Sequence, residues 1–363
     1  MRSLQWKDNL LGAVQVPLSP IVYMVIPGLN PEGYYLLSKL LCLCPERRIT
    51  AFDALQHPYF TNYHIFSGKG SIQGTPSKAY MGQAMDSKKP VIVKIFDRIK
   101  LNEGISSAVI REIAFLKEMD HENIVSVIDV VFTGMKIHLV MEAADMNLRQ
   151  FIDEHPKGVS DRHVRKNLLY QLLKGLDYCH SQKIIHRDLR PESLMINRDP
   201  LTLKISDFGT ARDFQVPVKA LTIIDRAKCV LYMPPEILYG KWRYTASVDM
   251  WAAGCIFAEI ARGKPLFQIG SNDYHMTSDI YQMQKILSVL GTPNEDLWPG
   301  VCEVFHNINS IKLIPSMDLH ELVPCLDPEE MDLLKQMICL NPSGRIMAAD
   351  ALKLSYFDDL RAA

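Results

Sequence analysis

Residues 186–193 read His186-Arg187-Asp188-Leu189-Arg190-Pro191-Glu192-Ser193 and directly follow the apolar run Lys183-Ile184-Ile185. Fourteen residues beyond Ser193 comes Asp207-Phe208-Gly209, followed by Pro234-Pro235-Glu236 and Asp249-Met250-Trp251-Ala252-Ala253-Gly254. Upstream, the strand-like run Val91-Ile92-Val93-Lys94 ends eighteen residues before Glu112. Taken alone, each motif has an ordinary explanation, because aspartates are common in turns and lysine–glutamate pairs are common on surfaces. Their order over about 160 residues indicates one shared chemistry.

This ordered series resembles the signature set of protein kinases. The resemblance covers the chain from about Ile65 to Phe357 and implies an α+β, bilobal fold. A small β-rich N-lobe with one main helix is expected over residues 63–143, and a larger, mainly α-helical C-lobe over residues 144–360. Residues 1–62 are expected to form a short helical appendage. The implied activity is transfer of a phosphoryl group from ATP, with Mg²⁺, to hydroxyls of protein substrates.

The catalytic roles follow from the resemblance and from the chemistry of phosphoryl transfer, in which the protein mainly positions reactants and neutralises charge. Lys94 would hold the α- and β-phosphates, and Glu112, in the helical pattern Ser107–Glu118, would fix Lys94. Asp188 would accept or orient the substrate hydroxyl. Asp207 would hold Mg²⁺ on the phosphates. Arg190 would lie beside the γ-phosphate, where most serine/threonine kinases carry lysine.

The same resemblance implies nucleotide-binding and structural residues. Those for ATP are Gly74, Ile92, Lys94, Met141, Glu142, Ala144 and Met195. Ile92 and Met195 would enclose the adenine, Met141 would be the gatekeeper behind it, and Glu142 with Ala144 would form the hinge. The residues with a structural role are Glu236 and Arg345, as a buried ion pair, and Asp249, as an anchor.

Several local sequences resemble the cyclin-dependent branch of the family. They are Gly104–Glu112, which looks like the cyclin-binding helix, Gly254–Glu259, and Leu290-Gly291-Thr292-Pro293 followed by Trp298-Pro299-Gly300. The expected partners are therefore a cyclin, bound through the Ser106–Glu112 helix, and protein substrates.

The alignment places Thr222 at the position of the activating phosphothreonine. A phosphate at that position needs arginines on which to dock. The family supplies three, and the matching positions here are Arg111, Arg187 and Arg212. We therefore expect activation by phosphorylation of Thr222.

Three departures from the family pattern bear on catalysis. Ser193 stands where the second Mg²⁺ ligand, an asparagine, is expected, so a serine hydroxyl would have to serve as the ligand. Of the three glycine-loop positions, Ile72, Gly74 and Ser77, only Gly74 is glycine. Cys229 and Met233 replace a threonine and an arginine of the substrate-side loop. Two functions remain open: an active serine/threonine kinase, or a pseudokinase that binds nucleotide or cyclin with little catalysis.

A repeat defines the N-terminal part. When the chain is shifted by 297 positions, residues 28–60 align with residues 325–357 without a gap, and 16 of 33 residues are identical. Chance would give about two identities at ordinary composition. The sequence thus predicts a duplicated C-terminal kinase fragment before the complete domain. Such a fragment cannot bury its own apolar face, so it would pack elsewhere, stay disordered or reflect an error in the gene model.

Composition is that of an ordinary globular protein, with 48% hydrophobic and 22% charged residues. A net charge of −1 gives no reason to expect nucleic acid binding. The uncharged segment from Leu10 to Leu29 holds three prolines, which suit a membrane-spanning helix poorly, so no membrane role is expected. The eight cysteines lack zinc spacing and read as reduced thiols. We expect an intracellular protein of the nucleus, the cytoplasm or both.

Overall fold

The structure is a computed structural model of the chain. It describes residues 31–42, 45–55, 57, 59, 63–65, 78–84, 87–97, 105–133, 136–213, 230–240, 245–268, 279–304 and 313–361. Gly74 and Thr222, and the uncharged segment Leu10 to Leu29, lie outside these residues. In the part of the chain that is described, no helix combines the length and apolar character needed to cross a bilayer.

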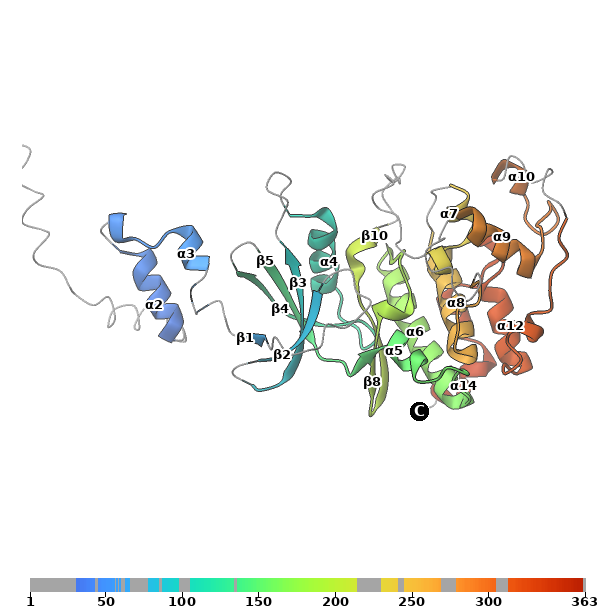
Figure 1. The fold of residues 1–363 in the computed structure, drawn as a ribbon, viewed down its shortest axis with the longest axis horizontal. Helices are drawn as coiled ribbons and strands as arrows, with labels where there is room; N and C mark the ends of the chain where they lie inside the picture. Colours follow the sequence, from blue (N-terminus) through green and yellow to red (C-terminus); the bar gives the residue numbers. More distant parts are fainter. Residues whose placement is uncertain are drawn as a thin grey trace, which may run out of the picture.

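The N-lobe is a five-stranded antiparallel sheet with one main helix (Figure 1). Its strand order is β1-β2-β3-β5-β4. The elements are β1 (Tyr63–Ile65), β2 (Lys78–Ala84), β3 (Pro90–Asp97), β4 (Val127–Thr133), β5 (Lys136–Glu142) and α4 (Ser107–Glu118). The side chains of Val91 and Val93 form a small cluster on one face, whereas Ile92 joins the main core on the other. Because alternate residues of a strand share a face, Lys94 lies on the Ile92 face.

The C-lobe is mainly helical and carries two small sheets. Its helices are α5 (Leu148–Asp153), α6 (Arg162–Ser181), α7 (Pro235–Leu238), α8 (Ser247–Arg262), α9 (Asp279–Leu290), α10 (Val301–Val304), α11 (Leu319–Leu322), α12 (Pro328–Met337), α13 (Ala348–Ala351) and α14 (Asp358–Arg361). Its strands are β6 (Met146–Asn147), β7 (Ile184–Ile185), β8 (Leu194–Arg198), β9 (Leu201–Ile205) and β10 (Arg212–Asp213). They pair in the orders β6-β8-β9 and β10-β7. The fold is the expected bilobal α+β architecture.

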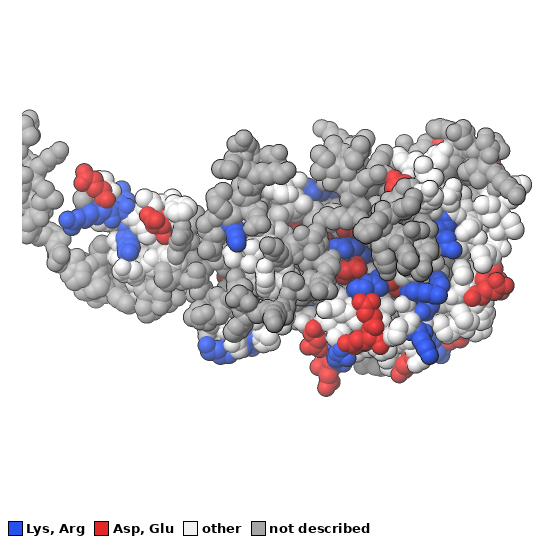
Figure 2. Space-filling model, viewed as in Figure 1, with Lys and Arg blue, Asp and Glu red and all other residues white. Residues whose placement is uncertain are grey.

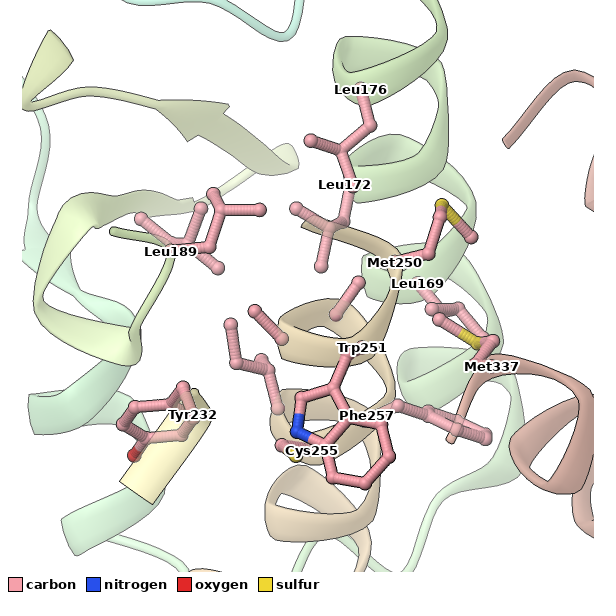
Figure 3. Packing of buried hydrophobic residues seen from close by; sticks show 14 of the residues in the cluster. Leu169, Leu172, Leu176, Leu189, Tyr232, Met250, Trp251, Cys255, Phe257 and Met337 are labelled. Atoms are coloured by element: carbon pink, nitrogen blue, oxygen red, sulfur yellow. The ribbon is translucent and has the colours of Figure 1, made fainter. Parts of the chain in front are cut away.

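Helix α8 is the centre of the C-lobe core. Every residue from Ser247 to Ala261 is buried, which matches a sequence that is apolar on all sides. Figure 3 shows Trp251 and Phe257 of α8 in this core, with Leu172 of α6 above them and Met337 of α12 beside them. A Cβ atom on Gly254 would lie 2.9 Å from Met337, so a glycine is needed where α12 crosses α8.

A buried ion pair connects α7 to the segment after α12. The Arg345 guanidinium donates to both carboxylate oxygens of Glu236, at 2.6 and 2.8 Å, and it lies over the ring of Trp251. Two parallel hydrogen bonds of this kind fix orientation as well as distance. The pair therefore holds α7 against α8.

The N-terminal fragment has local structure that parallels the C-terminal segment. It contains α2 (Pro31–Leu40), η1 (Pro45–Arg47) and α3 (Ala51–Leu55), and the shift of 297 places α2 on α12 and η1 on η8 (Pro342–Gly344). One hydrogen bond is also repeated: Arg48 Nε donates to the carbonyl of Cys42, as Arg345 Nε does to that of Cys339. Figure 1 places α2 and α3 at the opposite end of the molecule from α12.

The surroundings of the two segments nevertheless differ. Leu40 and Leu41 are 42% and 50% exposed, whereas their counterparts Met337 and Ile338 are buried. Tyr34, Leu36 and Ala54 are buried, as are their counterparts in the second segment. The two segments therefore share their local structure, but only the second belongs to the main core cluster.

Acidic and basic side chains alternate over the described surface of the C-lobe on the face shown in Figure 2. This distribution agrees with the net charge of −1.

Candidate active site

A lysine and two acidic residues from three distant segments meet at the junction of the lobes. Lys94 Nζ on β3 lies 2.5 Å from Glu112 Oε1 on α4 and 2.9 Å from Asp207 Oδ1, which follows β9. The Lys94 side chain is buried. A buried ammonium is costly unless it is paired, so the two carboxylates account for its position. The structure thus brings together two of the predicted catalytic residues, Lys94 and Glu112, and one predicted metal ligand, Asp207.

The charges of this cluster stabilise one another. Burial alone would lower the pKa of Lys94, but the carboxylates of Asp207 and Glu112 outweigh it and raise the pKa. Burial would likewise raise the pKa of Asp207, yet the Lys94 ammonium and the Arg190 guanidinium hold it well below its usual range. Both groups are therefore ionised at neutral pH, as phosphate and metal binding require.

Hydrogen bonds to Asp249 fix the backbone of the loop that carries Asp188. The buried Asp249 carboxylate accepts the backbone N–H groups of His186, at 2.9 Å, and Arg187, at 2.8 Å, and contacts the His180 ring at 3.0 Å. Arg187 has a φ of 72°, in the left-handed region that side chains normally avoid. Asp249 thus stabilises a loop conformation that would otherwise be unfavourable.

Arg190 lies among the acidic side chains of the site. Its Nη2 is 3.4 Å from Asp207 Oδ2, its Nε is 3.7 Å from Asp188 Oδ2, and its Nη1 is 3.6 Å from Glu192 Oε2. The guanidinium thereby bridges the carboxylate predicted to receive the substrate proton and the carboxylate predicted to hold the metal. Arginine stays charged at every relevant pH.

Ser193, the predicted second metal ligand, is fully buried. Its hydroxyl donates to the carbonyl of Arg190, at 2.9 Å, and accepts the N–H of the same residue, at 3.2 Å. Asp207 therefore fits the chemistry of a Mg²⁺ ligand, whereas the Ser193 hydroxyl is occupied in shaping the loop. No group of three or more His, Cys, Asp and Glu side chains suited to a metal ion occurs among the described residues.

The residues predicted to surround the adenine lie around the connection between the lobes. Ile92 on β3, Met141 on β5 and Met195 on β8 are buried members of the same core cluster. Ala144 is also in this cluster. Glu142 Oε1 is 2.8 Å from Lys204 Nζ on β9, so the first hinge residue is tied to the C-lobe. Their role in enclosing the adenine remains a prediction.

The three arginines predicted to receive a phosphate come from different elements around residues 209–212. Arg111 on α4 donates to the carbonyl of Gly209, at 3.3 Å. Arg212 on β10 pairs with Ile185 on β7, two residues before Arg187. Arg187 and Arg212 therefore lie on adjacent backbone segments, and the Arg111 side chain contacts Gly209.

One polar network was not predicted from the sequence. The buried Glu259 of α8 accepts a hydrogen bond from the Tyr232 hydroxyl, at 2.6 Å, and pairs with Arg149 of α5, at 2.7 Å. Burial raises the pKa of Glu259 although Arg149 opposes this. The sequence did contain a signal for this network: Glu259 is a single charged residue within the apolar run 255–261, and a buried carboxylate requires a partner.

A pocket opens beside Asp188. Its walls include the apolar side chains of Tyr232, Met233, Ile237 and Val248. Met233 is the residue that replaces the family's arginine, and it is buried in the core. Arg187, Asp188 and Asp249 also line the pocket, so the hollow next to the residue predicted to face the substrate hydroxyl is lined by both polar and apolar groups.

A bilobal fold with a Lys–Glu–Asp cluster at the lobe junction is the arrangement that protein kinases use. The family model of the protein kinase domain matches residues 69–357, most of the chain. The chain belongs to the protein kinase family. Members of this family transfer phosphoryl groups from ATP with the help of a divalent metal ion.

Proposed function

We propose that the chain is a protein serine/threonine kinase of the cyclin-dependent type, which transfers the γ-phosphate of ATP to protein hydroxyls. The observation that supports this most strongly is the Lys94 ammonium between the carboxylates of Glu112 and Asp207. A kinase requires this arrangement of the strand lysine and the helix glutamate for activity.

In the proposed reaction, the oxygen of a serine or threonine hydroxyl forms a bond to the γ-phosphorus while the bond from that phosphorus to the β–γ bridging oxygen breaks. Asp188 accepts the hydroxyl proton, and ADP leaves. Lys94 orients the α- and β-phosphates, and Arg190 neutralises charge that develops on the γ-phosphoryl oxygens. Asp207 would hold Mg²⁺, which would supply electrostatic stabilisation of the phosphates.

Regulation is part of the proposal. Helix α4 holds Glu112 inward, while Ile110 on the same helix is 54% exposed. A cyclin bound to the Ser106–Glu112 segment would therefore act on the position of Glu112 and hence on Lys94. We also propose that phosphorylated Thr222 docks on Arg111, Arg187 and Arg212, since an arginine cluster is the usual receptor for such a phosphate.

The alternative is a pseudokinase that binds nucleotide or cyclin with little catalysis. The hydrogen bonds of the Ser193 hydroxyl favour it, because they leave the expected second metal ligand without a substitute. The retention of Lys94, Glu112, Asp188 and Asp207 favours the active kinase.

A transfer assay separates the two functions. Full-length protein is incubated with Mg²⁺, γ-labelled ATP and a generic basic protein, and Asp188→Ala serves as the matched control. We expect label in the substrate, reduced about 10²- to 10⁴-fold in the variant. Equal signals from the two proteins would exclude catalysis at this site, and binding of ATP measured in parallel would then identify a pseudokinase.

A further inference from the structure

The number of cations that this site can hold is limited by Ser193. Kinases of this family hold two Mg²⁺ ions, through the aspartate of Asp-Phe-Gly and the asparagine of the catalytic loop. A serine oxygen is one bond closer to the backbone than an asparagine oxygen. Magnesium requires ligand distances of about 2.0–2.1 Å and tolerates little deviation. A ligand that is shorter by one bond therefore does not replace asparagine unless the backbone moves.

The backbone at this position is fixed by the serine itself. The Ser193 hydroxyl uses its only proton to donate to the Arg190 carbonyl and accepts the Arg190 N–H. Both bonds are fully buried, since Ser193 has no exposed surface. Moving the hydroxyl toward Asp207 would break both bonds. The Arg190 carbonyl would still accept the backbone N–H of Ser193, but the buried Arg190 N–H would lose its bond to the hydroxyl, which is unfavourable.

The Arg190 side chain places a positive charge where the second cation would bind, next to Asp207. The Arg190 guanidinium lies 3.4 Å from Asp207, 3.7 Å from Asp188 and 3.6 Å from Glu192, and the Arg190 residue is 7% exposed. A second divalent cation between Asp207 and position 193 would stand next to this permanent charge, because the guanidinium already contacts Asp207. In a site of low dielectric constant, like charges at such separations repel strongly.

We propose that the chain binds its nucleotide with a single divalent cation, held by Asp207 and the phosphates, and that Arg190 supplies the second positive charge. This inference rests on the proposed binding of ATP. It explains why the two departures, Ser193 for asparagine and Arg190 for lysine, occur together. The arginine fork reaches two carboxylates at once, which a lysine ammonium does less readily.

Counting bound metal ions tests the inference directly. Full-length protein is saturated with an ATP analogue whose β–γ bridge is an imido group, and Mn²⁺ is titrated while the paramagnetic resonance signal of free Mn²⁺ is recorded. Analogue binding is measured separately by calorimetry. We expect one Mn²⁺ per bound analogue in the wild type. Asp207→Asn should weaken that Mn²⁺ at least about tenfold.

A double substitution should restore the second ion. The double variant Arg190→Lys with Ser193→Asn lacks the guanidinium that contacts Asp207 and carries a longer side chain as metal ligand at position 193. We therefore expect two Mn²⁺ per bound analogue. The single variant Arg190→Lys should still bind one. A second measurement needs no variant: at saturating ATP, the transfer rate of the wild type should stop rising once ATP carries one Mg²⁺.

The outcomes are distinct. Two Mn²⁺ ions of similar affinity in the wild type, or a further rise of the rate with free Mg²⁺, would overturn the one-cation inference and leave the proposed function standing. An analogue that fails to bind with any metal would overturn the proposed function and this inference together.

Discussion

The Lys94 ammonium lies 2.5 Å from a carboxylate oxygen of Glu112, a contact that joins the third strand of the sheet to helix α4. The same nitrogen is 2.9 Å from Asp207, so the helix, the sheet and the C-lobe share one buried cation. The position of α4 therefore controls the orientation of the residue that would bind the phosphates.

Replacing Glu112 by glutamine should impair transfer without unfolding the protein. The neutral amide keeps the size of the side chain but loses most of the attraction to Lys94, so the ammonium should turn toward Asp207. We expect kcat/KM to fall about 10- to 100-fold, which corresponds to about 1.4–2.7 kcal/mol. Steady-state kinetics provide the measurement.

Glu118→Gln is the matched control, because Glu118 lies on the same helix and is exposed. It should leave kcat/KM unchanged. If both variants were equally active, the Lys94–Glu112 pair would not contribute to catalysis.

Asp249 should give the protein a pH-dependent stability. Burial raises its pKa, but hydrogen bonds from His180 and from backbone N–H groups lower it further than burial raises it. A carboxyl whose pKa is lower in the folded state stabilises that state above its unfolded pKa of about 3.9, and this stability is lost as the pH falls through the folded pKa.

The Asp249→Asn variant measures that contribution. An amide offers a donor where two backbone N–H groups need an acceptor, so we expect a loss of about 3 kcal/mol at pH 7. The difference in unfolding free energy between the variant and the wild type should become smaller below about pH 4, by at most about 1.4 kcal/mol per pH unit. Urea unfolding between pH 7 and pH 3 tests this, and a constant difference would contradict the assigned ionisation.

Sequence order predicted the fold and the proximity of Lys94, Glu112 and Asp207 well, because these residues belong to motifs whose positions depend on the fold itself. Their catalytic roles remain predictions. The expected bilobal architecture is confirmed, and the chain is a protein kinase. The assignments to the cyclin-dependent branch, to Thr222 and to the N-terminal duplication remain predictions.

The contacts made by individual side chains could not be predicted from the sequence as well as the fold. The hydrogen bonds of Ser193 depend on the backbone conformation of one 3-10 turn, which residue identity does not specify. The contacts of Arg190 depend on how three carboxylates converge from two loops. The Glu259–Arg149–Tyr232 network links segments that are 27 to 110 residues apart, and no spacing rule connects them.

The Glu236–Arg345 pair should be important for stability. Arg345→Met keeps the apolar part of the side chain but leaves the buried Glu236 carboxylate without its partner, which costs about 3–5 kcal/mol. The chain offers a matched control in Arg48→Met, because Arg48 occupies the same position in the N-terminal copy and is exposed. That change should alter the unfolding free energy by less than about 0.5 kcal/mol. Chemical denaturation of both variants measures the contrast, and similar losses would show that Arg48 is also buried in solution.

The N-terminal copy should contribute little to the stability of the kinase body, because it lacks one residue that α12 needs. Glu330 is fully buried, accepts from Arg165 at 2.8 Å and receives the Tyr356 hydroxyl at 3.0 Å, whereas the shift of 297 places Gly33 at this position. A fragment with glycine here would leave the buried Arg165 without its carboxylate if it took the place of α12. We therefore expect deletion of residues 1–62, which retains β1, to change the melting temperature by less than about 2 °C.

Glu330→Gly in the full-length chain is the counterpart of that deletion, since it gives α12 the residue found in the fragment. It should destabilise the protein by about 3–5 kcal/mol, because a buried arginine loses its partner. Differential scanning calorimetry of the two variants, compared with wild type, measures both effects. A fall of more than about 4 °C on deletion, with the transition still cooperative, would mean that residues 1–62 stabilise the body through contacts that do not depend on the position of Glu330.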